Sequence, residues 1–476
     1  EPYRRQRQMC IRDRERRLPM CKKLPHLLSA GIAVSLMGGC SFIPEYERPE
    51  SPVPGTYPGS GTLSEHVSPV SWRQFFLDSR LRQYIADSLD NNRDLQIAAL
   101  KVEQAHAQYR IEKSALLPSV NGSGAFTRER ANNSTGNRYN ASVNLTSYEV
   151  DLFGKIRSSA QAALEDYFAL EETRRSTQIA LIAQVAVQYF AYLEYAEQLD
   201  LSRKTLDTVQ NYADMTKRKV QFGKDPESNL AMMDVQIETA RASVHAYSRL
   251  MTQAAHALEE LTSKPIVGEK MASRSLERRY LVADIPAGLP SNLITRRPDI
   301  LAAEHALRAA NANIGASRAA FFPSITLTGS MGGESSELSR LFDKPGRAWS
   351  FSPQVSLPIF TGGRNKASLD ASRIGKRIEI ANYEKTIQTA FREVSDALVA
   401  RREYRKQLEA QQALVATQQR RLEFSQIKYN NGITGYLDVL TAQQDLFSAQ
   451  QDLISIRSAQ LQNLVMLYKA LGGGCE

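Results

Sequence analysis

Four segments of the chain alternate between apolar or small residues and short polar ones, as Val143, Asn144 and Leu145 illustrate. A period of two is typical of β-strands, whose successive side chains point to opposite faces of a sheet. The polar positions are almost all Ser, Thr, Asn or Gln, and the strands are about ten residues long, enough to cross a bilayer when tilted. A half-buried sheet in a soluble domain gives the same alternation, but these two features favour a membrane β-barrel. The predicted strands are about 119–128, 139–153, 324–332 and 347–360.

Two stretches, 155–221 and 364–430, are predicted to be very long helices. The first contains neither Pro nor Gly, and the second contains no Pro and one Gly. Apolar residues follow spacings of three and four, as in Ile182, Val185 and Tyr189, which is the seam of a coiled coil. At ~1.5 Å per residue such a helix extends roughly 100 Å, much further than a bilayer is thick.

Each long helix is expected to end at a glycine, because glycine readily adopts the left-handed conformation that terminates helices. These glycines are Gly223 and Gly432. Ala-rich helices then return near 227–262 and 436–471. Asp225 is expected to cap the first of them, with Pro226 in its first turn.

The two halves of the chain repeat the same order of features. The paired landmarks are Pro118 and Pro323, Gly154 and Gly363, and Gly223 and Gly432. Their separation drifts only from 205 to 209 positions, which indicates an internal duplication. The predicted organisation is an N-terminal extended segment over 40–78, a first repeat over 79–264, an equatorial linker over 265–296 and a second repeat over 297–474.

The predicted fold class is therefore mainly α with transmembrane β, built on a duplicated repeat. Four strands cannot close a barrel, and an open sheet edge would leave backbone groups unpaired in lipid. Sheets from several chains must complete one another. The sequence thus predicts an oligomer in which a strand barrel continues into a barrel of helices.

The amino-terminal region contains a predicted targeting signal. Residues 20–39 contain a basic start, an apolar run too short to span a membrane and small residues before Cys40, which resembles a bacterial lipoprotein signal peptide. Met37 departs from the Leu preferred three places before the cysteine, and an ordinary secretory leader is the alternative. Cys40 is the expected lipidation site, and Ser41 favours the outer membrane by the same resemblance. Residues 1–19 precede this leader and are interpreted as an upstream or artefactual extension.

Charge and composition exclude several classes of function. The formal net charge is +9, but nine of the basic and three of the acidic residues lie in 1–39, which leaves about +3 without them and argues against a nucleic-acid partner. No nucleophile elbow, phosphate loop or zinc-ligand spacing occurs, and His245 and His256 have no third ligand nearby. We expect no enzyme activity and no cofactor other than the lipid on Cys40.

Several motifs together resemble the TolC-like outer membrane efflux factors, and within them the OprM/NodT-type lipoproteins. They are the start Cys40-Ser-Phe-Ile-Pro44-Glu-Tyr46, the phrase Arg296-Arg-Pro298-Asp299-Ile with Glu304, and the ending Leu467-Tyr468 with Gly472-Gly-Gly474. The resemblance runs from Cys40 to about Gly474.

This resemblance implies a homotrimer in the cell outer membrane, with twelve strands in one barrel and a helical tunnel across the periplasm. It implies two partners, a periplasmic adaptor and an inner-membrane transporter of the resistance-nodulation-division type. The protein would be a passive exit duct rather than an enzyme. Antibiotics, solvents, metals and siderophores are all compatible cargo.

By resemblance, the gate is expected at the periplasmic helix tips. Tyr429 and Leu437 occupy positions that constrict the aperture in related proteins, although packing between helices is the alternative role for each. Thr441 and Gln444 stand where the family has an Asp and an Arg that tie the tips together. A neutral pair forms weaker hydrogen bonds.

The loss of that charged pair predicts either an aperture that opens more easily or a latch at another position. The candidates for such a latch are Asp438 in the second repeat and Asp225 and Glu227 in the first.

The same resemblance places adaptor hairpins in the grooves between the tips. The candidate adaptor contacts are Gly223, Gly432, Thr434 and Gly435. A role in the turn alone is the alternative for each glycine.

Two other classes of protein compete with the channel. A periplasmic coiled-coil scaffold or adaptor lipoprotein would explain the long helices but not the four alternating strands. An exported enzyme would need a catalytic constellation, which the sequence lacks.

Overall fold

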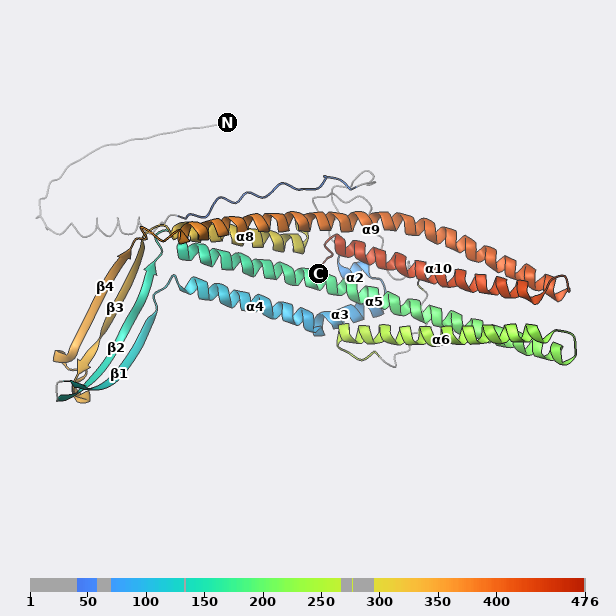
Figure 1. The fold of residues 1–476 in the computed structure, drawn as a ribbon, viewed down its shortest axis with the longest axis horizontal. Helices are drawn as coiled ribbons and strands as arrows, with labels where there is room; N and C mark the ends of the chain where they lie inside the picture. The colour runs from blue at the N-terminus through green and yellow to red at the C-terminus, as the bar shows by residue number, and fades with distance from the viewer. Residues whose placement is uncertain (1–40, 58–69, 132–133, 267–275, 277–294, 475–476) are drawn as a thin grey trace, which may run out of the picture.

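The protein is a long rod with a small sheet at one end and two helical hairpins at the other (Figure 1). A computed structural model describes residues 41–57, 70–131, 134–266, 276 and 295–474. The predicted leader, Cys40 and most of the equatorial linker lie outside the described residues.

The two repeats contain matching elements. The first consists of α4 (Arg93–Ser114), β1 (Val120–Ala131), β2 (Ser134–Val150), α5 (Lys155–Gln221) and α6 (Glu227–Thr262). The second consists of α8 (Pro298–Ala319), β3 (Ser324–Ser335), β4 (Arg347–Ser356), α9 (Arg364–Asn430) and α10 (Tyr436–Ala470). Both α4 and α8 have 22 residues and both α5 and α9 have 67, which supports the duplication. The short helices α2 (Trp72–Phe75) and α3 (Ser79–Asn91) precede the first repeat.

The hairpin ends of the strands reach further than predicted. β1 continues to Ala131, β2 begins at Ser134 and β3 continues to Ser335. Backbone pairing continues there through residues such as Arg130, which lies opposite Thr135. The prediction was wrong at these ends because it followed hydropathy, whereas a ladder needs only backbone groups.

The helix-side ends of β2 and β4 come earlier than predicted. β2 stops at Val150, because the carboxylate of Asp151 turns to accept hydrogen bonds from the backbone N–H groups of Ile156 (3.1 Å) and Arg157 (2.9 Å). β4 stops at Ser356, shortly before Pro358, which has no N–H group to donate to a ladder.

The four strands form one antiparallel sheet in the order β1-β2-β3-β4. A bulge interrupts the register between Leu145 and Tyr148, where Ser147 has a positive φ of 43°. Within the described part of the chain, the outer edges of β1 and β4 have no partner strand. The sheet is thus open on both sides.

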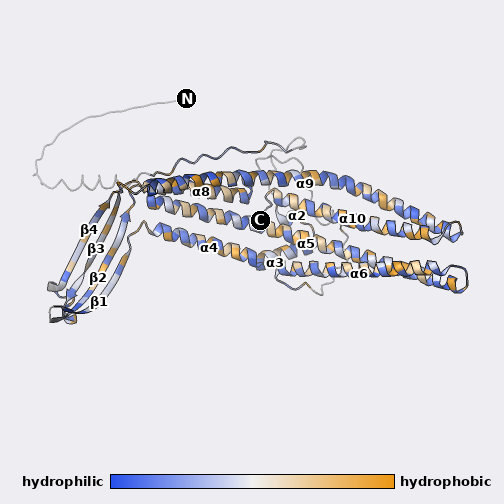
Figure 2. Ribbon diagram, in the orientation of Figure 1, coloured by the Kyte–Doolittle hydropathy of each residue, from blue (hydrophilic) through white to orange (hydrophobic). Residues whose placement is uncertain are grey.

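The predicted coiled-coil seam is confirmed as part of the core. Ile182, Val185 and Tyr189 on α5 are fully buried, as is Val394 on α9. Hydrophobic and hydrophilic residues are interspersed along all the long helices (Figure 2). Among the described helices, only α5 contains a window long and apolar enough to cross a membrane, and 56% of that window is buried inside the fold, which fits a core helix.

A buried arginine holds the second repeat together where three helices meet. The guanidinium of Arg297, which precedes α8, donates to the carbonyl of Ala470 at the end of α10 (2.8 Å). It also pairs with Asp299 (2.7 Å) and with Glu393 on α9 (2.9 Å). The Arg-Arg-Pro-Asp motif therefore has a structural role.

Replacing this arginine should destabilise the protein. We expect Arg297→Ala to lower the free energy of unfolding by about 2 kcal/mol, because the buried guanidinium no longer donates to Ala470 O or pairs with Asp299 and Glu393. Thermal unfolding in detergent, followed by circular dichroism, measures the change. Arg296→Ala is the matched control: that neighbour is exposed, and its loss should change the value by less than about 0.5 kcal/mol. Equal effects of the two variants would contradict this assignment.

Candidate functional site

The two hairpin tips at the far end of the rod are built in the same way. Gly223 and Gly432 follow α5 and α9 with φ angles of 64° and 69°. In each turn the next residue closes back onto the helix, since Lys224 N–H donates to Lys219 O (2.9 Å) and Ile433 N–H donates to Lys428 O (2.9 Å). Both glycines are needed for their left-handed conformation.

A hydrogen bond from Tyr429 joins the two hairpins. Its hydroxyl donates to Oδ2 of Asp225 (2.8 Å), and Oδ1 of the same carboxylate accepts from the amide of Asn229 (2.7 Å). Nζ of Lys219 lies 4.9 Å from the centre of the Tyr429 ring. Asp225 thus joins the first repeat to the second, whereas its role as a latch of the aperture stays a prediction.

The environment of Tyr429 keeps its hydroxyl protonated. Burial, followed by the hydrogen bond to Asp225 and its negative charge, raises the pKa of Tyr429 from 10.0 to about 12. Because the pKa is raised in the folded chain, the contribution to stability is complete below about pH 10 and is lost as the pH rises through about 12.

An apolar cluster lies directly behind this contact. It contains Met233 from α6 and Tyr436, Val439 and Leu440 from α10. The rings of Tyr429 and Tyr436 meet edge to face at 5.3 Å. Burial raises the pKa of Tyr436, whose hydroxyl has no hydrogen-bond partner among the described residues.

The other predicted gate residues do not join the hairpins. Leu437 is 59% exposed and Asp438 is also exposed. The hydroxyl of Thr441 donates to Leu437 O within its own helix (2.9 Å), and the side chain of Gln444 is exposed. In this chain, Thr441 and Gln444 form no latch between α10 and the first repeat.

The structure corrects the predicted cap of α6. Pro226 occupies the N-cap position, with no side-chain hydrogen bond to the helix, and Asp225 turns to Tyr429 instead. Glu227 is exposed in the first turn. The sequence analysis missed Asn229, which holds the other carboxylate oxygen of Asp225. In the sequence, Asn229 is only a polar residue four positions after an aspartate. This spacing is too common to identify a contact by itself.

Gly435 differs from the two turn glycines. Its φ of −71° and ψ of 160° suit any residue, and a Cβ atom added there would meet nothing within 4 Å. Neither conformation nor space inside the chain requires glycine. The neighbouring Thr434 is half-buried, and its hydroxyl has no partner among the described residues.

At the opposite end of the rod, the sheet has two chemically distinct faces. One face carries a hydroxyl and amide network in which Ser123 contacts Ser142 (3.0 Å) and accepts from Asn144 (2.8 Å). The other face carries large apolar side chains, of which Met331 is 72% and Trp349 78% exposed. Such faces suit a wet lumen on one side and lipid on the other.

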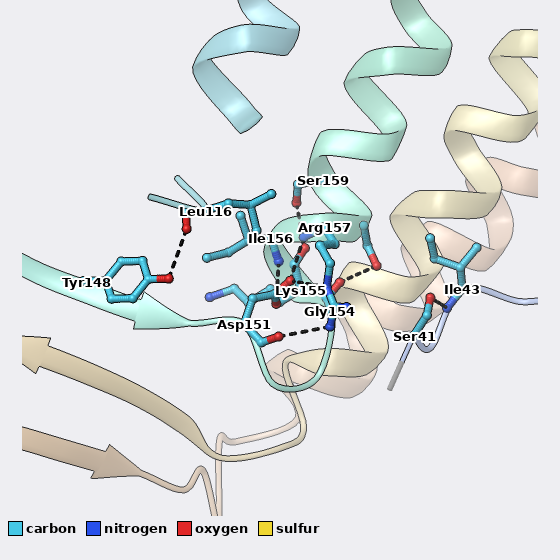
Figure 3. Close-up of polar contacts among 11 residues, drawn as sticks. Ser41, Ile43, Leu116, Tyr148, Asp151, Gly154, Lys155, Ile156, Arg157 and Ser159 are labelled. Atoms are coloured by element: carbon cyan, nitrogen blue, oxygen red, sulfur yellow. Dashed lines mark hydrogen bonds and ion pairs between the residues drawn. The ribbon is translucent and has the colours of Figure 1, made fainter. Parts of the chain in front are cut away.

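The described N-terminal segment begins at the junction between sheet and helices (Figure 3). Figure 3 shows Ser41 and Ile43 beside the turn at Gly154. The ring of Phe42 stacks on Phe322 at 4.6 Å, next to the end of α8. Further along, Arg48 pairs with the buried carboxylate of Glu304 on α8. The segment is therefore fixed to the wall close to the membrane end.

The contact between Tyr429 and Asp225 should hold the tips together. We expect Tyr429→Phe to speed hydrogen exchange of the amides around residues 219–229 by roughly fivefold to tenfold, because a hydrogen bond to a charged group is lost. Exchange mass spectrometry measures this change. Tyr436→Phe is the matched control, since it removes a hydroxyl that has no partner and should leave exchange unchanged. If both variants exchange alike, the hydrogen bond does not join the tips.

Comparison with known proteins agrees with this architecture. The family model described as outer membrane efflux protein matches residues 84–264 and 289–473. The toluene efflux pump outer membrane protein TtgC of Pseudomonas putida is 45% identical over 462 residues, which cover 94% of this chain and 95% of the relative.

Solved structures share the fold over nearly the whole chain. A crystal structure of CusC has a TM-score of 0.85 at 37% identity and covers 91% of this chain and 100% of its own. The open state of the Neisseria gonorrhoeae MtrE outer membrane channel has a TM-score of 0.85 at 37% identity and covers 92% of this chain and 99% of its own. These likenesses support a channel and not the scaffold alternative, and they confirm that the protein is not an enzyme. This chain belongs to the outer membrane efflux protein family.

Proposed function

We propose that this protein is the exit duct of a tripartite efflux pump. It spans the outer membrane, extends into the periplasm and passively conducts small molecules to the exterior. A periplasmic adaptor and an inner-membrane transporter, of the resistance-nodulation-division type, would deliver the cargo. One observation carries the proposal. A sheet with one polar and one apolar face continues directly into helices of 67 residues.

The functional unit is a homotrimer. The sheet has two unpaired edges, β1 and β4, and neither could remain open in lipid. Three copies would pair β4 of one chain with β1 of the next and give twelve strands, the number that the family resemblance implies. The Ser and Asn face would then line the lumen.

The gate lies at the periplasmic tips. The hydrogen bond between Tyr429 and Asp225 holds the two hairpins of a chain together, and the exposed Leu437 narrows the aperture. Because Thr441 and Gln444 form no charged latch, the resting aperture depends mainly on Tyr429 and Asp225. The outer surface near Gly435, where glycine is not needed for conformation or space, accepts an adaptor hairpin, together with Thr434, Gly223 and Gly432.

A lipid on Cys40 anchors the protein to the membrane. Phe42 packs at the junction of strands and helices, two residues after Cys40, so a lipid on that cysteine would lie close to the inner edge of the apolar band. The contact between Arg48 and Glu304 then fixes the segment to the helical wall.

Single-channel recording tests the conducting function and its gate. The wild-type protein in planar bilayers should give stepwise conductance, and its mass in detergent should be that of a trimer. Leu437→Ala should raise the conductance by about twofold or more, because an exposed side chain at the constriction becomes smaller. Leu414→Ala is the matched control, since that leucine is also exposed but lies 16 residues before the end of α9. If Leu437→Ala conducts like the wild type, the constriction lies elsewhere.

Metabolic labelling with palmitate tests the lipid anchor. We expect label in the wild type and in Cys475→Ser, and none in Cys40→Ser, because only the cysteine at the end of the leader would be processed. Label that persists in Cys40→Ser would contradict the anchor.

A further inference from the structure

Basic residues at the outer rim of the sheet are concentrated on its apolar face. On β1, Arg128 and Arg130 continue the row of side chains that contains Phe126. On β4, Arg347 continues the row that contains Trp349. Side chains two residues apart share a face, so these arginines point in the same direction as the lipid-facing aromatic residues.

The opposite face of the same rim has a different charge. Its side chains include Glu129, Arg138 and Glu334, and Arg138 pairs with Glu334 at 3.3 Å. The lumenal side of the rim is therefore acidic or neutral, whereas the outward side is basic.

The loop between β3 and β4 adds to the outward side. Gly333 shares the apolar face with Met331, and a Cβ atom on Gly333 would lie 1.9 Å from the carbonyl oxygen of Leu341, so the loop folds over that face. Leu341 is buried against the sheet, while Phe342 is 69% exposed. The loop contains two cations, Arg340 and Lys344, and two exposed carboxylates, Glu337 and Asp343, so it adds no net charge; Arg340 pairs with Glu337 at 3.2 Å.

These cations lie at the height of lipid headgroups. Arg128 and Arg347 each lie two residues further out along their strand than an aromatic residue, Phe126 or Trp349. Two residues of a strand span about 7 Å. Aromatic residues of this kind mark the edge of the apolar band. The polar headgroup layer on each side of a bilayer is of similar thickness. Arg128 and Arg347 can therefore reach phosphate groups while their neighbours Phe126 and Trp349 remain at the interface.

We propose that this outward surface, formed by the strand residues Arg128, Arg130 and Arg347, binds the phosphate groups of the phosphorylated glycolipid of the outer leaflet. Guanidinium groups bind phosphate oxygens with two parallel hydrogen bonds. A cluster of cations favours a headgroup with net negative charge over a zwitterionic one, whose ammonium group it repels. In the homotrimer proposed above, β4 of one chain adjoins β1 of the next. Arg347 would then stand at the same seam as Arg128 and Arg130 of the neighbouring copy, and each of the three seams would hold one basic cluster.

Native mass spectrometry of the purified full-length protein in detergent, titrated with diphosphoryl lipid A, tests this proposal. We expect Arg128→Gln/Arg347→Gln to weaken binding by about tenfold or more, because each cation near an anionic lipid surface contributes substantially to affinity. Arg138→Gln is the matched control: it removes an exposed arginine at the same rim but on the lumenal face, and it should leave lipid A binding unchanged. Dephosphorylated lipid A should bind much more weakly to the wild type.

Several outcomes would overturn the proposal: equal weakening by Arg138→Gln, unchanged affinity in the double variant, or equal binding of the dephosphorylated lipid. Displacement of lipid A by inorganic phosphate at millimolar concentration would indicate a free-phosphate site instead. If the double variant does not assemble, the single variants Arg128→Gln and Arg347→Gln give the same comparison. Single-channel conductance should be unaffected, so a failure here is distinguishable from a failure of the conducting function.

Discussion

A bilayer offers no hydrogen-bond partners to a peptide backbone, and this constraint governs the architecture of the chain. The sheet of four strands satisfies its inner ladders but ends at two open edges, β1 and β4. In lipid each edge would need a partner strand from outside the chain, and the barrel proposed above meets this need by pairing several copies. The duplication adds to this, because each repeat contributes one hairpin and one pair of helices to the common wall.

The long helices have a different requirement from that of the strands. A helix of 67 residues cannot be stabilised by local propensity alone and needs a continuous packing surface. The seam through Ile182, Val185 and Tyr189 provides this surface near the middle of the rod, and Arg297 closes the site where α8, α9 and α10 meet. Towards the tips the apolar cluster becomes small, and the polar contact between Tyr429 and Asp225 joins the hairpins there. A thin core with polar ties lowers the free energy of local opening at the tips, as the gate proposed there would need.

Charge is distributed along the rod according to the surroundings of each part. The middle of the polar sheet face has neutral hydroxyl and amide groups. At the outer rim, Arg128 and Arg347 lie on the apolar face, whereas Arg138 on the polar face pairs with Glu334. At the tips, a carboxylate accepts a hydrogen bond from a tyrosine. Arginine therefore occurs on an apolar sheet face, in a buried junction and in an exposed ion pair, with burial and partners deciding each role.

The sequence by itself determined the elements and their order. Periodicity is a local property, so strict alternation located all four strands, and an absence of helix-breaking residues located α5 and α9 with their observed bounds. The turns at Gly223 and Gly432 were also predicted, because glycine readily adopts the left-handed conformation that ends a helix. Strand ends were predicted less well, since backbone pairing and the competing role of Asp151 are not expressed in hydropathy.

Only the tertiary structure decided which residues meet across the repeats. Tyr429 and Asp225 are 204 positions apart, and no local pattern links them. The sequence offered Asp225 both as a cap of α6 and as one of several latch candidates, and it could not identify Tyr429 as its partner. Asn229 was likewise not predicted, although it donates a hydrogen bond to Asp225. Thr441, which stands at a latch position of the family, instead donates to a carbonyl of its own helix. Contacts between distant segments depend on how the two hairpins pack, and that packing is a property of the folded chain alone.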